Sequence, residues 1–129
     1  MKHRHPSRLV VAIGGNALLH RGEAPSIANQ RANVGAAARV LAELSRDHGL
    51  VITHGNGPQV GLLARQSEAV SGSEPVPFDV LVAESEGLIG YLLAEEIGRQ
   101  IGAERVVVLL TLVAFGLGAL PLAWWLGRV

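Results

Sequence analysis

Short apolar runs and amphipathic stretches alternate along most of the chain. Residues 9–13 are apolar, mostly β-branched residues that stop at two glycines, and residues 50–53 form a second such run. Runs of this length and composition predict strands that are buried on both faces of a sheet. A third apolar run at residues 106–110, directly after Arg105, predicts a third strand of the same kind.

Three stretches with helical spacing lie between the predicted strands. Residues 29–47 carry their apolar side chains on one face, and glycine in the pair at 48–49 is expected to end this helix. A proline suited to a first helical turn opens a second helix at 58–70, and a third is expected at 79–100. Strands alternating with helices in this order predict an α/β fold with a parallel sheet.

Composition narrows the function classes for a chain of 129 residues, which is the length of one domain. The 11 basic residues balance the 11 acidic ones, and aromatic residues make up 4% of the chain. Nucleic-acid binding is therefore not expected, because it needs a basic footprint and often stacking rings. The chain has no cysteine, which excludes a disulfide scaffold and a thiolate metal site, and no metal ligands are assigned.

The charged residues are distributed unevenly, since residues 106–127 contain none. A helix of this length would span a membrane, with Trp124, Trp125 and Arg128 at the interface. If residues 106–111 form a strand, however, the remaining apolar stretch is too short for a comfortable span. A second interpretation is a frameshift or truncation after about Thr111 that replaced the continuation of the chain. Residues 1–7 are expected to form a flexible tail without signal-peptide features, so a cytoplasmic location is expected.

Two glycine loops directly follow the first two predicted strands. Gly14, Gly15 and Asn16 follow the first, and His54 with Gly55, Asn56 and Gly57 follows the second. Ligands of parallel sheets bind beyond the carboxyl ends of the strands, where glycines allow close approach and positive φ angles. Both loops would therefore direct N–H groups at one anion, a phosphate or a carboxylate. Each loop alone is also compatible with a plain turn, and neither is a Walker A or a dinucleotide-binding motif.

Several polar side chains near these loops are weaker candidates. His54 is a candidate proton donor or ligand contact, although a histidine at a strand end is more commonly a hydrogen-bonded turn residue. Gln59 lies in the first turn of a predicted helix and is a candidate to face the pocket, whereas Gln66 is expected in solvent. Glu84 and Glu86 lie near the start of the third predicted helix. An interaction of these carboxylates with the helix dipole is therefore favoured over a catalytic carboxylate pair.

Four blocks of sequence together resemble the carbamate kinases of the amino acid kinase family. They read VVAIGGNALL, QRANV, LVITHGNGPQVGLL and DVLVAESEGLIGYLLAEE, in the family's order, within residues 8–111. The resemblance implies a three-layer αβα sandwich with a mainly parallel sheet, here incomplete, and leaves residues 112–129 as an apolar tail outside the family pattern. Because the resemblance ends there and the rest of the family's chain is missing, a frameshift or truncation is favoured over a membrane anchor. It also implies a cytoplasmic homodimer that transfers a phosphoryl group reversibly between ATP and carbamate, giving carbamoyl phosphate and ADP with Mg²⁺.

The resemblance assigns the carbamoyl phosphate side of the site to the residues of the two loops, namely Gly14, Gly15, Asn16, Gly55, Asn56 and Gly57. The family's catalytic lysines come from later parts of chains more than twice this length, and Lys2 is the single lysine here. Catalytic residues are therefore left unassigned, and the chain alone is expected to be inactive. The alternative is a non-catalytic remnant or anion-binding module, associated with a membrane through its tail.

Overall fold

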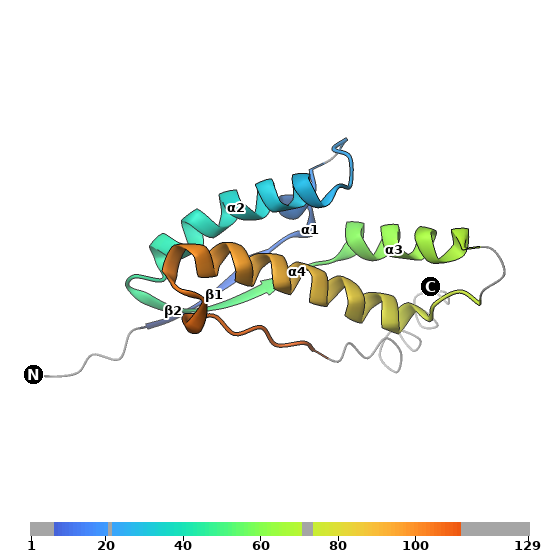
Figure 1. The fold of residues 1–129 in the computed structure, drawn as a ribbon. Coiled ribbons are helices and arrows are strands. Elements are labelled where there is room, and N and C mark those ends of the chain that lie inside the picture. Colours follow the sequence, from blue (N-terminus) through green and yellow to red (C-terminus); the bar gives the residue numbers. More distant parts are fainter. Residues whose placement is uncertain (1–6, 21, 71–73, 112–129) are drawn as a thin grey trace, which may run out of the picture.

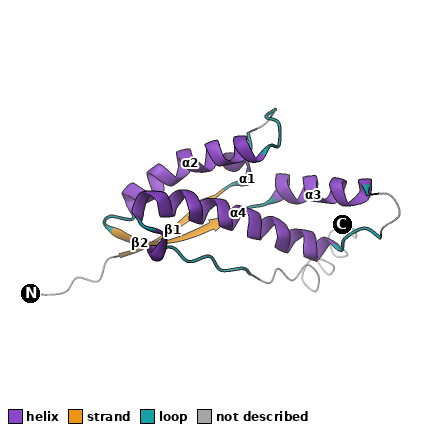
Figure 2. Cartoon of the chain, viewed as in Figure 1, coloured by secondary structure: helices purple, strands orange, loops and turns teal. Residues whose placement is uncertain are grey.

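The structure, a computed structural model, describes residues 7–20, 22–70 and 74–111. Within them a parallel pair of strands lies beside helices (Figures 1 and 2). Residues 1–6 of the expected N-terminal tail and the apolar tail at 112–129 lie outside the described residues. The elements in chain order are β1 (Ser7–Ile13), α1 (Gly15–Leu18), α2 (Ile27–Leu44), β2 (His48–His54), α3 (Gly57–Ala69), α4 (Phe78–Ile101) and the 3₁₀ turn η1 (Ala103–Arg105).

The sheet carries helices on one of its two faces. Val11, Leu50 and Ile52 point toward α2 and α4 and pack against the main core, which consists of Ile13, Leu18, Val34, Ala38, Leu41, Ile89, Leu92, Leu93 and Ile97. Val10 and Val51 point to the opposite face, where they are 67% and 50% exposed. The predicted α/β class with a parallel sheet is confirmed, and the described residues supply the sheet and one of the expected helix layers.

The boundary between α2 and β2 differs from the prediction. Ser26 caps α2 by accepting a hydrogen bond from the Asn29 N–H at 3.1 Å, so the helix begins at Ile27, two residues before the predicted start. His48 and Gly49 do not end this helix but open β2, where they pair with Ser7 and Arg8. Strand pairing, which the local sequence does not encode, overrides the helix-ending tendency of the glycine.

Helix α4 connects the two apolar clusters of the described chain. The predicted helix at 79–100 is confirmed, with one further residue at each end. Its second half belongs to the main core, while Leu81 and Val82 in its first turns pack with Val60 of α3 in a smaller cluster. Glu95 of α4 forms a part-buried ion pair with Arg31 of α2 at 2.5 Å, which links the two helices.

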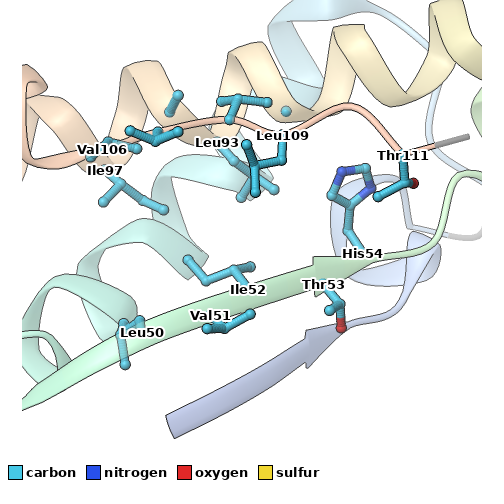
Figure 3. Close-up of a pocket in the computed structure, with 14 residues that line it drawn as sticks. Leu50, Val51, Ile52, Thr53, His54, Leu93, Ile97, Val106, Leu109 and Thr111 are labelled. Carbon is cyan, nitrogen blue, oxygen red and sulfur yellow. The ribbon is translucent and has the colours of Figure 1, made fainter. Parts of the chain in front are cut away.

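The predicted strand at 106–110 is not part of the sheet in the described structure. This segment runs extended beside α4, where Val108 lies against Gly90 and the Thr111 hydroxyl donates to Glu86 Oε2 at 3.2 Å. A cavity of about 370 Å³ separates it from β2 (Figure 3). An apolar run becomes a strand only when a neighbouring strand shares its hydrogen bonds, and here the segment makes its hydrogen bonds and its contact at Gly90 with α4.

No helix within the described ranges is long and apolar enough to cross a membrane. The alternative of a membrane-associated tail concerns residues 112–129, which lie outside the described residues.

Candidate functional site

The two glycine loops lie in contact at the carboxyl ends of β1 and β2. The Gly55 N–H donates to the Ile13 carbonyl at 3.0 Å, which ties the start of the second loop to the end of β1. A Cβ atom added to Gly55 would lie 3.5 Å from the Gly15 nitrogen, and one added to Gly15 would lie 2.9 Å from Pro58 Cδ. The parallel register ends with Ile13 opposite His54, and so it places both loops at the same edge.

The reason for the glycines differs from the one predicted. Within the described residues positive φ occurs at Gly22 and Gly102, and at no glycine of the two loops. Gly14 has an ordinary extended backbone, with φ at −70° and ψ at 147°. Gly15 is required because Pro58 occupies the space of a side chain, whereas no atom lies within 4 Å of where the Cβ of Gly14 or Gly57 would be. The glycines therefore provide close packing between the loops and open space beside the backbone.

The first turn of α3 offers unpaired N–H groups beside this open space. Asn56 is the N-cap residue, Gly57 and Pro58 are the first two helical residues, and proline has no N–H. In the described part of the chain the N–H groups of Gly57 and Gln59 have no hydrogen-bond acceptor. Free N–H groups at the positive end of a 13-residue helix attract an anion.

The polar side chains of the second loop are directed into the protein. Asn56 Nδ2 donates to Ser85 Oγ of α4 at 2.7 Å. His54 closes β2, and its Nδ1 is buried without a hydrogen-bond partner among the described residues. Figure 3 shows the His54 ring between β2 and the segment at 106–111. The loop thus presents its backbone, and not the Asn56 amide nitrogen, as the available donor.

Gln59 is buried between two helices, with 2% of its surface exposed. Its Nε2 donates to Gln30 Oε1 of α2 at 3.3 Å, while its Oε1 has no partner within the described residues. Gln59 therefore connects α3 to α2. Gln66 is exposed, as predicted, and so is Glu84. Glu86 accepts the two hydrogen bonds from Thr111, a partner that the sequence pattern does not indicate.

Two cavities flank the second loop. One of about 530 Å³ is lined on α3 by Gly57, Gly61 and Arg65, and opposite them by residues of the 19–25 loop that include Glu23. The Asn33 side-chain amide and the His20 N–H donate to Glu23 and hold its pKa below the ordinary value. The other cavity, of about 300 Å³, is lined by residues that include His54, Asn56, Glu86 and Thr111.

The remaining candidates belong to the first loop. Gly14 is the N-cap of α1, and Gly15 and Asn16 are the first two residues of this single turn, which the sequence analysis treated as loop. The Ala17 N–H donates to the Gly14 carbonyl at 2.9 Å and closes the turn. A four-residue helix is too short for a periodic apolar pattern to reveal it.

Ser85, which accepts the hydrogen bond from Asn56, is not among the residues singled out from the sequence. It lies in the block AESEG, and the spacing of Val82, Ser85 and Ile89 places it on the buried face of α4. A fully buried serine on an apolar helix face needs a polar partner, and this signal was available in the sequence.

The described residues provide no cluster of three His, Asp or Glu side chains that could hold a metal ion. The donors that the two loops make available are backbone N–H groups.

Comparison with curated proteins finds extensive similarity to carbamate kinases. The chain is 55% identical over 103 residues to carbamate kinase of Escherichia coli, a match that covers 80% of this chain and 35% of that protein. It is 49% identical over 107 residues to carbamate kinase of Rhizobium meliloti, covering 82% of this chain and 33% of that protein. The chain therefore spans about a third of the length of these relatives.

Solved structures give the same result for the fold. Carbamate kinase from Giardia superposes with a TM-score of 0.71 at 35% identity, covering 78% of this chain and 36% of that one. A Giardia lamblia carbamate kinase bound to AMP-PNP gives a TM-score of 0.71 at 36% identity, covering 76% of this chain and 32% of that one. The amino acid kinase family matches residues 7–115, which is most of the sequence. The chain belongs to the amino acid kinase family.

Proposed function

We propose that this chain forms the phosphoryl-binding part of a carbamate kinase. The proposed reaction is the reversible transfer of a phosphoryl group from ATP to carbamate, which gives ADP and carbamoyl phosphate. The observation that carries the proposal is the junction of the two glycine loops, where the first turn of α3 leaves the N–H groups of Gly57 and Gln59 without acceptors. The similarity to carbamate kinases over 80% of the chain supplies the substrate class.

The proposed role of the loops is to bind and orient phosphoryl oxygens. Backbone N–H groups at a helix start are held in place before the ligand arrives, so they stabilise negative charge without reorganising. In phosphoryl transfer, positioning and charge stabilisation supply most of the catalysis, and little covalent chemistry falls to the protein. Gly14, Gly15 and Asn16 would face the same anion from β1, while Gly55, Asn56 and Gly57 would face it from β2.

The use of ATP or ADP together with Mg²⁺ is part of the proposal because the family resemblance implies it. Mg²⁺ is usually held by one or two carboxylates together with substrate phosphates. Because the described residues contain no cluster for a metal ion, the role proposed for this segment rests on the N–H groups. The homodimer and the cytoplasmic location that the resemblance implies are part of the same proposal.

We expect the 129-residue chain by itself to bind the anion without turnover. Lys2 is its single lysine, and a developing phosphoryl charge needs more cationic groups than the two loops provide. Incubation of the purified chain with ADP, Mg²⁺ and carbamoyl phosphate should therefore form no ATP above the blank. Formation of ATP at a rate proportional to chain concentration would contradict this expectation.

Binding is tested by titrating inorganic phosphate and carbamoyl phosphate into the ¹⁵N-labelled chain at constant ionic strength. Both ligands should shift the amide resonances of Gly57 and Gln59, while those of the distant helix end near Gly98 stay unchanged. Binding should also raise the unfolding temperature as the ligand concentration exceeds the dissociation constant. If neither ligand shifts these amides more than chloride does, the proposed site is wrong, and of the alternatives only a remnant without an anion site gains support.

A further inference from the structure

Two long helices of this chain begin in different ways. At α2 the N-cap Ser26 turns back and accepts a hydrogen bond from the Asn29 N–H at 3.1 Å. At α3 the N-cap Asn56 makes no such bond within the described structure, and its backbone, at φ −132° and ψ 9°, lies outside the extended conformation that Ser26 has at φ −88° and ψ 151°. Asparagine is among the best N-cap residues, and it normally accepts from the second or third N–H of its helix. The missing cap at α3 therefore requires a cause.

Ser85 holds Asn56 in this uncapped conformation. Its side chain is fully buried, and its hydroxyl donates to the Val82 carbonyl at 2.7 Å. A serine hydroxyl has one hydrogen, so only its lone pairs remain for Asn56, and they accept from Asn56 Nδ2 at 2.7 Å. An Asn56 side chain with its oxygen turned toward Ser85 would place two acceptors together. The chemistry of Ser85 therefore fixes both the direction and the orientation of the Asn56 amide.

The position of the Asn56 side chain determines whether the Gln59 N–H has a hydrogen-bond acceptor. Pro58, the second residue of α3, has no N–H, so the Gln59 N–H is the one remaining target for a capping asparagine. While Asn56 is bonded to Ser85, the Gln59 N–H keeps no acceptor within the described residues. A self-capped α3 would occupy the same donor that an incoming anion needs.

We propose that Ser85 is a positioning residue, which holds the Asn56 side chain on α4 and so keeps the first turn of α3 open for a phosphoryl oxygen. This role rests on the proposed function of the loops. Ser85 does not touch the ligand itself, but removes a competitor for the Gln59 N–H.

The test compares the wild-type chain with Ser85→Ala in amide hydrogen exchange and in phosphate titration. In Ser85→Ala the Asn56 side chain is released, so the Asn56 backbone can take the extended conformation of an N-cap and the side-chain oxygen can cap α3. The Gln59 amide should then exchange more slowly. Since an N-cap is worth about 1 kcal/mol, or a factor of about five, phosphate affinity should fall about three- to tenfold. Adding Asn56→Ala to Ser85→Ala removes the released cap, and affinity should return to within about twofold of that of Asn56→Ala alone.

A second pair of variants keeps the test informative if Ser85→Ala does not fold. Asn56→Ser places a good cap that is too short to reach Ser85, so it should bind phosphate about three- to tenfold more weakly than Asn56→Ala. Ser26→Ala is the control, because it removes the cap of α2 and should lower stability without changing phosphate affinity. Unchanged Gln59 exchange in Ser85→Ala, or equal affinities of Asn56→Ser and Asn56→Ala, would overturn the proposal.

These readouts separate the two proposals. If the wild-type chain binds no phosphate, the proposed function fails, yet Gln59 exchange in Ser85→Ala still decides whether Ser85 controls the cap. If the wild-type chain binds phosphate and Ser85→Ala binds it equally well with unchanged exchange, only the role of Ser85 fails.

Discussion

Gly15 and Pro58 meet so closely that a Cβ atom on the glycine would lie 2.9 Å from the proline Cδ. The contact joins the loop after β1 to the first turn of α3. Both residues have restricted freedom to move, since proline is a ring and the glycine belongs to the turn of α1. The two loops can therefore lie this close together because Gly15 has no side chain.

Replacing Gly15 by alanine should separate the loops. The added methyl group overpacks the contact, so we expect the free energy of unfolding to fall by about 1–3 kcal/mol, together with weaker phosphate binding. Chemical denaturation and phosphate titration measure the two effects. Gly14→Ala is the matched control for stability, because no atom lies within 4 Å of its Cβ position and its φ is −70°. Equal stability of the two variants would contradict the close contact.

The segment at 106–111 should depend on the small size of Gly90. A Cβ atom there would lie 2.7 Å from Val108 Cγ1, so Gly90→Ala should push the segment off α4. We expect faster proteolysis after residue 105 and a loss of about 1–3 kcal/mol in the free energy of unfolding. Val108→Ala should restore protection in the double variant. A Gly90→Ala chain that resists protease as well as the wild type would disprove this packing.

The Glu23 carboxylate should stabilise the folded chain at neutral pH and lose this effect in acid. Its pKa in the folded chain lies below the ordinary value of 4.5, first because the Asn33 amide donates to it and then because the His20 N–H does. A lowered pKa means that the folded state favours the ionised form, so this stabilisation is lost as the pH falls through the lowered pKa. As the pH falls below about 4.5, the unfolding temperature of the wild type should therefore decrease more steeply than that of Glu23→Gln. Parallel pH profiles would rule out this contribution.

The sheet face that carries no helix among the described residues should drive self-association. Val10 and Val51 are paired in the parallel register and are 67% and 50% exposed, so they form adjacent apolar positions. Changing both to threonine keeps the β-branched shape and should shift association to higher protein concentrations in sedimentation experiments, with less than about 0.5 kcal/mol change in stability. Val40→Thr is the control, since Val40 is 58% exposed on α2. An equal effect of the control would show that general apolarity, not the sheet face, causes the association.

The long helices and the two paired strands were predictable from the sequence because their signals are local. The apolar spacing and the proline fixed α3 and α4 to within a residue at each end. Three features were not predictable in the same way. The first two residues of β2 depend on Ser7 and Arg8, which lie about 40 positions earlier, and the segment at 106–111 depends on whether a strand partner is present. The turn of α1 is too short to leave a periodic pattern.

The candidate site was predictable in its position but not in its geometry. The parallel order of the strands was enough to bring Gly15 and Gly55 to one edge of the sheet. Positive φ angles were the wrong physical reason for these glycines, because tight packing and open backbone space do not leave distinct sequence signals. The partner of Asn56 lies on a helix that begins more than twenty residues later, and only the folded chain shows that Ser85 is within reach.

The small cluster beneath α3 has a consequence for the thermodynamics of binding. Val60, Leu81 and Val82 are its buried members, whereas the main core contains three times as many buried residues. A helix anchored by so little buried surface can detach by local unfolding at a free energy below that of global unfolding, while β1 and β2 remain paired. A ligand at the first turn of α3 binds only the docked form, so part of its intrinsic affinity is spent in shifting this equilibrium. The measured dissociation constant would then report the docking of α3 as well as the strength of its contacts with phosphate.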